Sequence, residues 1–135
     1  MEEKLLFKEE CFMIVGLCMK IHRKLGKGFK ESVYKDALEI ELQNAIIPYE
    51  REKKFKIEYE NVILRHTFDA DFLVYKSIIV EIKAASMVHA DAFRQTVNYL
   101  RSEQIKLGIL INFGTDVLQF QRIICSSYIS GNLKK

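Results

Sequence analysis

The sequence predicts an α/β protein in which helices flank a mixed β-sheet. Apolar residues recur at helical spacing in the first third of the 135-residue chain, and the period becomes strand-like between Tyr49 and Ala85. A further helical pattern then precedes two apolar segments, at 106–114 and 118–128. The resulting order is helix, helix, three strands, helix, strand, strand, which is typical of a layered α/β domain.

Two helices are expected in the N-terminal third. The first covers about residues 7–25, and Gly26 and Gly28 end it. The second runs from about Lys30 to Asn44, before a break at Pro48. The inward-facing residues predicted from the spacing are Phe7, Cys11, Ile14, Cys18, Ile21 and Leu25 on the first helix, and Tyr34, Leu38, Leu42 and Ala45 on the second.

Three strands are expected between residues 50 and 85. Residues 50–60 alternate, with Phe55, Ile57 and Tyr59 on one side, as in a strand with one face in water. Segments 66–75 and 77–85 are expected to form a hairpin with a tight turn near Lys76. The next helix, over 89–104, is predicted to turn Ala92, Phe93, Val97 and Leu100 inward.

Composition favours one globular domain over residues 1–135. Hydrophobic residues make up 49% of the chain and charged residues 29%, and the net charge of +3 is far below that of a histone-like binder. Three cysteines without a C-x-x-C pair indicate reduced thiols. The apolar run 11–19 is too short to span a bilayer. A cytoplasmic protein without a membrane span is therefore expected.

Four ionisable residues lie inside the predicted hairpin, in otherwise apolar sequence: Asp69, Asp71, Glu81 and Lys83. If the hairpin turns near Lys76, paired residue numbers sum to about 152, so Asp71 lies opposite Glu81 and Asp69 opposite Lys83. Side chains alternate along a strand, so all four share one face. The other face is predicted to carry Ala70, Phe72, Val74, Ile78, Val80 and Ile82.

The hairpin cluster has two interpretations. In the first it is a structural ion-pair cluster, in which Lys83 neutralises Asp71 or Glu81. In the second the surplus of carboxylates over amines holds a hard divalent cation such as Mg²⁺, which prefers oxygen ligands. The spacing by itself leaves both open.

The arrangement of Asp71 and, ten residues later, Glu81-Ile-Lys83 resembles the active-site motif of the PD-(D/E)XK nuclease superfamily. The surrounding sequence is similar to the GxxExxY branch, whose motif stands here as Gly28, Glu31 and Tyr34. The similarity continues through "FDADFLV", "IIVEIKA", "RQTVNYLR", "KLGILINFG" and "LQFQRII". It covers the chain from the first helix to about Ile124 and implies an αβββαβ core.

The resemblance also implies a catalytic site. Asp71 and Glu81 would ligate Mg²⁺ or Mn²⁺, with the backbone carbonyl of Ile82 as a third ligand. Lys83 would hold or polarise the attacking water, or stabilise the charge that develops on the phosphate. Two further contributions are implied: Glu31 as a ligand or water-positioning group, and Gln95 and Tyr99, which match a Q-x-x-x-Y element of RecB-like members. Asp69 departs from the family pattern, where a basic residue is common.

The sequence thus predicts a metal-dependent nuclease that hydrolyses nucleic-acid phosphodiesters, with DNA favoured over RNA. The alternative is an inactive nuclease-fold module that binds nucleic acid or a protein partner. No membrane partner is expected, and the oligomeric state is open, with a homodimer among the alternatives. Four basic residues of the first strand are candidate phosphate contacts: Arg51, Lys53, Lys54 and Lys56.

Overall fold

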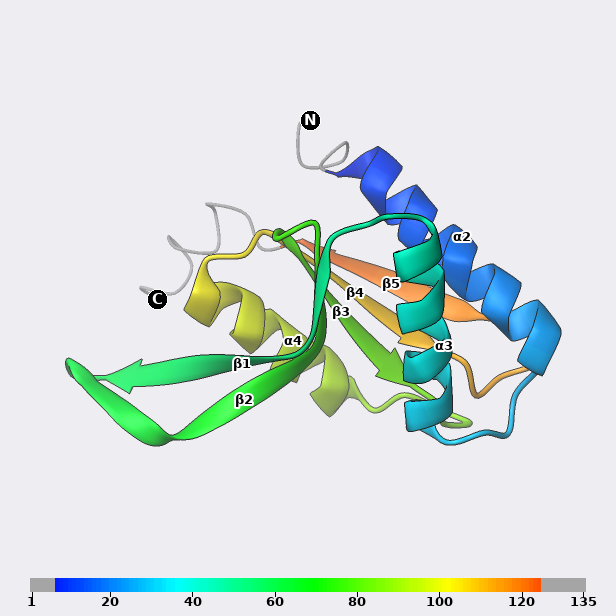
Figure 1. Cartoon of the computed structure of the whole chain (residues 1–135). Helices are drawn as coiled ribbons and strands as arrows, with labels where there is room; N and C mark the ends of the chain where they lie inside the picture. The colour runs from blue at the N-terminus through cyan, green and yellow to red at the C-terminus, as the bar shows by residue number, and fades with distance from the viewer. Residues whose placement is uncertain (1–6, 125–135) are drawn as a thin grey trace.

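The structure is a computed structural model that describes residues 7–124. Three helices and five strands follow one another in the predicted order (Figure 1). Their bounds are α2 (Lys8–Leu25), α3 (Glu31–Asn44), β1 (Tyr49–Tyr59), β2 (Val62–Val74), β3 (Ile78–Lys83), α4 (Ala90–Glu103), β4 (Leu107–Asn112) and β5 (Gln119–Ile124). The predicted order of elements is confirmed.

The five strands form one mixed sheet in the order β1-β2-β3-β4-β5. Strands β3 and β4 are parallel, joined through α4, and the other neighbouring pairs are antiparallel. Strand β4 is fully buried and carries the almost uninterrupted apolar sequence that predicted it, and β3 is buried except for Lys83 at its end. This is the α/β sheet with flanking helices that the sequence predicts.

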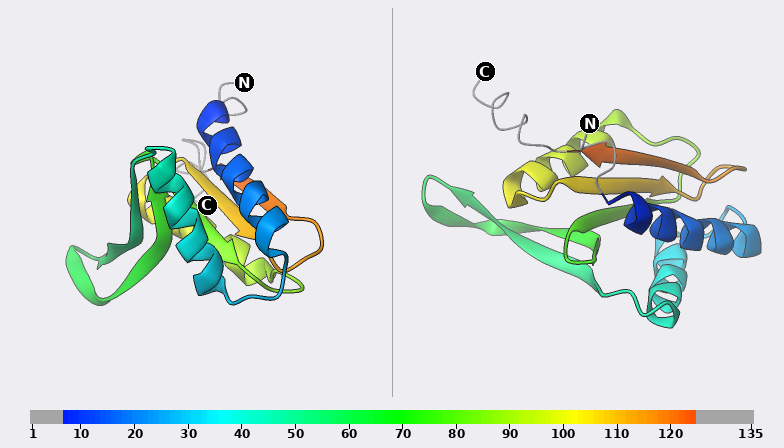
Figure 2. Two further views of the ribbon diagram at one scale, coloured as in Figure 1. Left: turned by 45° about the vertical axis from the view of Figure 1, so that its right-hand side comes forward. Right: turned by 90° about the horizontal axis from the view of Figure 1, so that it is seen from above.

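Two apolar cores lie on the two faces of the sheet. Helices α2 and α3 cover one face, where Tyr34, Phe72 and Phe113 belong to the larger core (Figures 1 and 2). Helix α4 covers the other face, where Leu100 packs with Phe68 in the smaller core. Each helix buries one apolar stripe, because only that stripe can reach the sheet.

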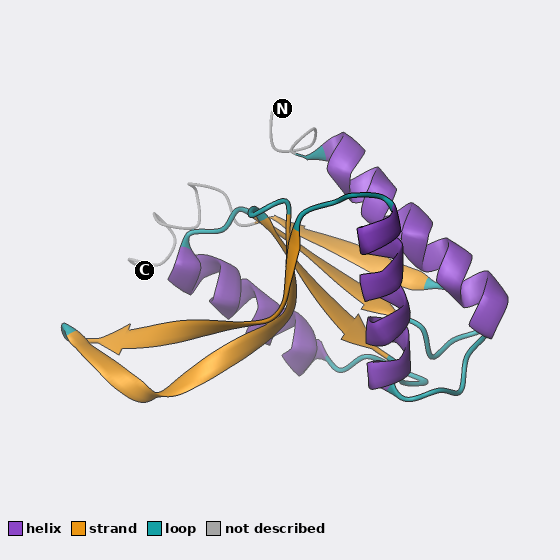
Figure 3. Ribbon diagram, viewed as in Figure 1, coloured by secondary structure: helices purple, strands orange, loops and turns teal. Residues whose placement is uncertain are grey.

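The hairpin of β1 and β2 extends well beyond the rest of the sheet (Figures 2 and 3). The pairing of β2 with β3 covers only Phe72 to Val74, whereas its pairing with β1 continues to Val62. Most of β2 therefore has one strand neighbour, and the distal part of the hairpin is a two-stranded ribbon.

The turn between β2 and β3 lies where the sequence predicts it. Tyr75 and Lys76 both have positive φ, at 56° and 59°, and the N–H of Ser77 donates to the carbonyl of Val74 at 3.1 Å. Two positive φ values identify a type I′ turn, whose twist suits an antiparallel hairpin. Neither central residue is the glycine that such a turn favours.

Most predicted core residues are buried, and the exceptions lie at the ends of elements or on the ribbon. Leu25, Ala45, Tyr59 and Phe93 were expected to face inward but are exposed. Leu25 and Ala45 end their helices, where the chain turns away from the sheet. Residues 125–128 of the predicted last strand lie outside the described residues. No helix between residues 7 and 124 has the length and hydropathy needed to cross a membrane.

Candidate active site

Regular pairing of β2 with β3 ends where Asp71 begins. The observed pairs, from Val74 with Ile78 to Phe72 with Val80, have the predicted sum of 152. At the next position, side-chain carboxylates accept the backbone hydrogen bonds in place of the strand carbonyls. The N–H of Ile82 donates to Asp71 Oδ2 at 2.7 Å, and the N–H of Asp71 donates to Glu81 Oε2 at 2.9 Å. Asp71 and Glu81 are therefore neighbours, as the sequence predicts.

The alternation of side chains in β2 breaks at the same position. Phe72 belongs to the core under α2 and α3, whereas Ala70 belongs to the core under α4. The prediction that Ala70 and Phe72 share a face is therefore wrong. On the β1 side, Arg51 pairs with Phe72 and Lys53 pairs with Ala70. The residues between them, Glu52 and Asp71, do not form a regular strand pair. The backbone irregularity around Asp71 frees its carboxylate to bond to β3 rather than to project regularly from the sheet.

Glu81 is a buried carboxyl group, with 6% of its surface exposed. Burial raises its pKa to about 8, and the neighbouring charge of Asp71 adds to the increase. The hydrogen bond from the Asp71 N–H and the charges of Lys83 and Lys35 act in the opposite direction. Glu81 thus lies in an environment that favours either a proton or further positive charge.

Lys35 of α3 is the lysine that contacts Asp71. Its Nζ donates to Asp71 Oδ1 at 3.2 Å and also forms an ion pair with Glu52 of β1. The expectation that Lys83 bridges to Asp71 or Glu81 in a structural ion pair is not met among the described contacts. Sequence reasoning missed Lys35 because its partners are distant in the chain, although it lies next to Tyr34 of the GxxExxY-like motif.

Lys83 ends β3, beside Glu81, whose pKa its charge lowers. Its position is fixed through the backbone: the Lys83 carbonyl accepts a hydrogen bond from the N–H of Phe113 at 2.8 Å. The buried Asn112 then links the two strand ends. Its Oδ1 accepts from the N–H groups of Ala85 and Gly114, and its Nδ2 donates to the Ala85 carbonyl. Asn112 is a second residue that sequence reasoning did not single out.

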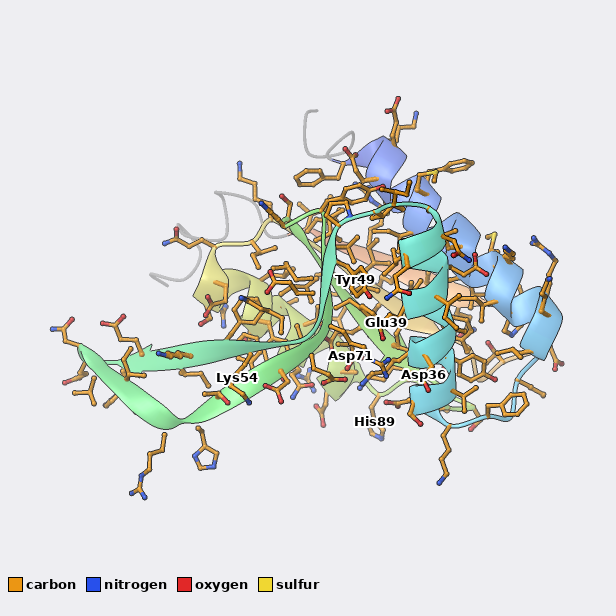
Figure 4. All side chains as sticks on the ribbon, in the orientation of Figure 1. Asp36, Glu39, Tyr49, Lys54, Asp71 and His89 are labelled. Carbon is orange, nitrogen blue, oxygen red and sulfur yellow. The ribbon has the colours of Figure 1, made fainter. Side chains whose placement is uncertain are left out.

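Asp69 does not lie opposite Lys83 as predicted. It pairs with Lys54 of β1 and forms an ion pair with it, Nζ to Oδ1, at 2.9 Å. The prediction assumed that β2 and β3 stay paired as far as Asp69, but the two strands pair only between Phe72 and Val74 on β2. Lys54 and Asp71 are both labelled in Figure 4, along the hairpin.

Three of the four basic residues of β1, Arg51, Lys53 and Lys54, are paired with acidic neighbours. Arg51 contacts Asp36 and Glu39 of α3, and Lys53 contacts Glu50. Figure 4 shows Asp36 and Glu39 on the side of α3 that approaches β1. These pairs reduce the positive charge that the strand would offer to phosphates.

Three other predicted site residues lie on the helices α3 and α4. Glu31 is exposed in the first turn of α3, four residues before Lys35, and thus on the same side of the helix. Tyr99 of α4 stacks on Phe68, with ring centroids 3.7 Å apart. Burial raises the pKa of Tyr99, and the charges of Glu81, Asp71 and Asp69 raise it further. Gln95 is exposed one turn before Tyr99.

Tyr34, the last residue of the GxxExxY-like motif, has a structural position. It is fully buried, stacks on Phe113 with centroids 4.4 Å apart, and donates its hydroxyl to the Gly26 carbonyl at 2.6 Å. The Tyr34 hydroxyl oxygen also accepts a hydrogen bond from the N–H of Phe29 at 3.3 Å. Tyr34 therefore fixes the loop between α2 and α3, and with it the start of the helix that carries Glu31 and Lys35.

The donor set suits a divalent cation in part. Asp71 and Glu81 are neighbouring residues that each carry a carboxylate, and burial followed by the charge of Asp71 raises the pKa of Glu81, so a cation placed there would be favoured. Within residues 7–124, however, no three His, Cys, Asp or Glu side chains gather closely enough to hold a metal ion. A metal at this pair would need backbone or water oxygens, or movement of Glu31, to complete its shell.

Two grooves on the surface are lined by other residues. One lies between α4 and β5 and includes His89, Arg94 and Gln121, and the other lies between α2 and β5 and includes Phe12 and Arg122. Neither is lined by Asp71, Glu81 or Lys83. The charged cluster therefore lies outside both of these grooves.

Comparisons with known proteins agree with this architecture. A family model described as the PD-(D/E)XK nuclease superfamily matches residues 8–123. A solved structure titled "Crystal structure of SSO0001" aligns with a TM-score of 0.56 and 21% sequence identity, over 76% of this chain and 55% of that one. The present chain thus spans about half the length of that neighbour. At 21% identity the likeness supports the fold alone. No curated protein matches the chain.

Proposed function

Because the chain belongs to the PD-(D/E)XK nuclease superfamily, we propose that it is a metal-dependent nuclease that hydrolyses phosphodiester bonds, DNA in preference to RNA. We also propose that it belongs to the GxxExxY branch, on its motif at Gly28, Glu31 and Tyr34. The observation that carries the proposed activity is the side-by-side placement of Asp71 and Glu81, with Lys83 two residues further along the same strand.

Asp71, Glu81 and the backbone carbonyl of Ile82 are proposed to hold Mg²⁺ or Mn²⁺, with Glu31 as a further ligand. The N–H of Ile82 points to Asp71, and in a strand the carbonyl of the same residue points to the same side, which supports that assignment. A divalent ion bound there would lower the pKa of a water molecule and neutralise phosphate charge.

The remaining roles belong to side chains around the carboxylate pair. Lys83 is proposed to orient the attacking water or to stabilise negative charge that develops on the phosphate. Tyr99 and Gln95 are proposed to contact the phosphate or to position Lys83 from the α4 side. The effect of Glu81 and Asp71 on the pKa of Tyr99 supports a hydroxyl close to the carboxylates.

A second candidate function is an inactive module that binds nucleic acid or a protein partner. Two observations favour it: Lys35 already neutralises Asp71, and in the part of the chain described here no three His, Cys, Asp or Glu side chains are arranged to hold a metal ion. Under this reading the charged residues are a structural network in which Lys35 holds α3 against the sheet.

Cleavage assays on matched variants test the proposal. Single- and double-stranded DNA and RNA would be incubated with purified protein in Mg²⁺, in Mn²⁺ and in chelator. We expect metal-dependent cleavage by the parent and by Asp91→Asn, an exposed carboxylate on α4, and none by Asp71→Asn or Lys83→Met. Equal cleavage by all four proteins would assign the activity to a contaminant, and binding without cleavage by the parent would favour the inactive module.

A further inference from the structure

Lys35 occupies the oxygen of Asp71 that a metal ion would need. Asp71 Oδ2 accepts the N–H of Ile82 at 2.7 Å, and Asp71 Oδ1 accepts Lys35 Nζ at 3.2 Å. We propose that Lys35 is a resident cation of this site, which neutralises Asp71 in the metal-free protein and competes with a divalent ion for it. This inference rests on the proposed function, since it assumes that Asp71 binds a metal.

The ion pair is partly shielded from water. The side chains of Lys35 and Asp71 expose 14% and 15% of their surfaces. A shielded pair is stronger than a surface pair, because water screens it less. The neighbouring carboxylates of Asp71 and Glu81 also attract positive charge, because the charge of Asp71 disfavours the ionised form of Glu81. The ammonium group of Lys35 thus satisfies, in the folded chain, the electrostatic demand that a metal would satisfy.

Glu52 gives Lys35 a second partner. It lies in β1 between Arg51 and Lys53 and forms no regular strand pair with β2. Its φ of 53° is in the left-handed region, which an L-residue adopts at an energetic cost. This local backbone conformation brings the Glu52 carboxylate to Lys35, with which it forms an ion pair. When a metal binds Asp71, Lys35 therefore still has Glu52 as an ion-pair partner.

The competition has a direction that can be measured. Removing the charge of Lys35 frees Asp71 Oδ1 and removes a repelling cation, so the dissociation constant for Mn²⁺ should fall by about five- to tenfold. Lys35→Met removes the charge and retains most of the apolar stem. Lys35→Arg keeps a cation near Asp71 and should bind Mn²⁺ much as the parent does.

The test is calorimetric titration of Mn²⁺ into the parent, Lys35→Met, Lys35→Gln, Lys35→Arg and Lys20→Met. Lys20 forms an ion pair with Glu41 between α2 and α3, away from Asp71, so Lys20→Met controls for the loss of one positive charge. Circular dichroism verifies that each variant is folded, and Lys35→Gln replaces Lys35→Met if the latter is not.

Tighter binding by Lys35→Met or Lys35→Gln, with Lys20→Met and Lys35→Arg close to the parent, supports the inference. Binding by Lys35→Met alone, with no binding by the parent, supports it as well. Equal or weaker binding after loss of the Lys35 charge overturns it but leaves the proposed nuclease function intact. If neither the parent nor the Lys35 variants bind Mn²⁺, the inference and the proposed metal site are both rejected.

Discussion

The backbone N–H of Asp71 donates a hydrogen bond to Glu81 Oε2 at 2.9 Å, so the two acidic residues are linked although their charges repel. The link holds a buried carboxylate next to a second carboxylate at the point where β2 and β3 cease to pair. This arrangement makes stability depend on pH and on the groups around the pair.

Stability of the metal-free protein should fall as pH rises from about 4.5 to about 8. Glu81 has a raised pKa, of about 8, so in this range the folded state binds a proton that the unfolded state has released. The unfolding free energy then decreases with pH, by at most about 1.4 kcal/mol per pH unit for one proton. Urea unfolding in chelator across this range measures the slope.

Glu81→Gln should flatten that dependence, because glutamine cannot titrate and can still accept from the Asp71 N–H. The exposed Glu50→Gln serves as the control and should leave the slope unchanged. A Glu81→Gln slope equal to that of the parent would show that another group titrates.

Asn112→Ala should lower the unfolding free energy by about 2–4 kcal/mol. Asn112 is 2% exposed, and its amide satisfies the N–H groups of Ala85 and Gly114 and the carbonyl of Ala85. Truncation leaves these backbone groups without that partner. Chemical denaturation measures the loss, and Asn98→Ala on the exposed side of α4 should cost less than about 0.5 kcal/mol. Equal losses in the two variants would contradict the assigned role of Asn112.

Lys76→Gly should raise the unfolding free energy by about 0.5–1 kcal/mol. Lys76 is exposed and has a φ of 59° in the turn between β2 and β3, a conformation that glycine adopts without steric cost. Lys56→Gly, in the extended β1 strand, should have the opposite sign, because glycine weakens a strand. Thermal unfolding of both variants gives the comparison, and destabilisation by Lys76→Gly would refute the strain argument.

Two substitutions at Tyr99 separate its ring from its hydroxyl. Tyr99→Ala removes the stack on Phe68 and should cost about 1–3 kcal/mol of stability. Tyr99→Phe keeps the stack and should change stability by less than about 0.5 kcal/mol. If the hydroxyl contacts the phosphate as proposed, Tyr99→Phe should still reduce the rate of any metal-dependent cleavage by about tenfold or more. Unchanged cleavage by Tyr99→Phe would remove Tyr99 from the site.

The sequence by itself determined the order of elements, most of the core and the neighbouring placement of Asp71 and Glu81. The helical stripe of α2, the apolar runs of β3 and β4, and the turn at Lys76 are local patterns, and local patterns report burial directly. The hairpin register followed from that turn, because a tight turn fixes which residues pair.

Only the tertiary structure decided which charges meet. Lys35 reaches Asp71 because α3 packs across the sheet beside β1 and β2, and no spacing in the sequence encodes that crossing. Asp69 forms its ion pair with Lys54 because the part of β2 that precedes Phe72 is paired with β1 and not with β3. Asn112 links two loops that are distant in the chain. Long side chains satisfy their charges with whatever the packing brings near, so the partners of a buried carboxylate are fixed by the fold as a whole.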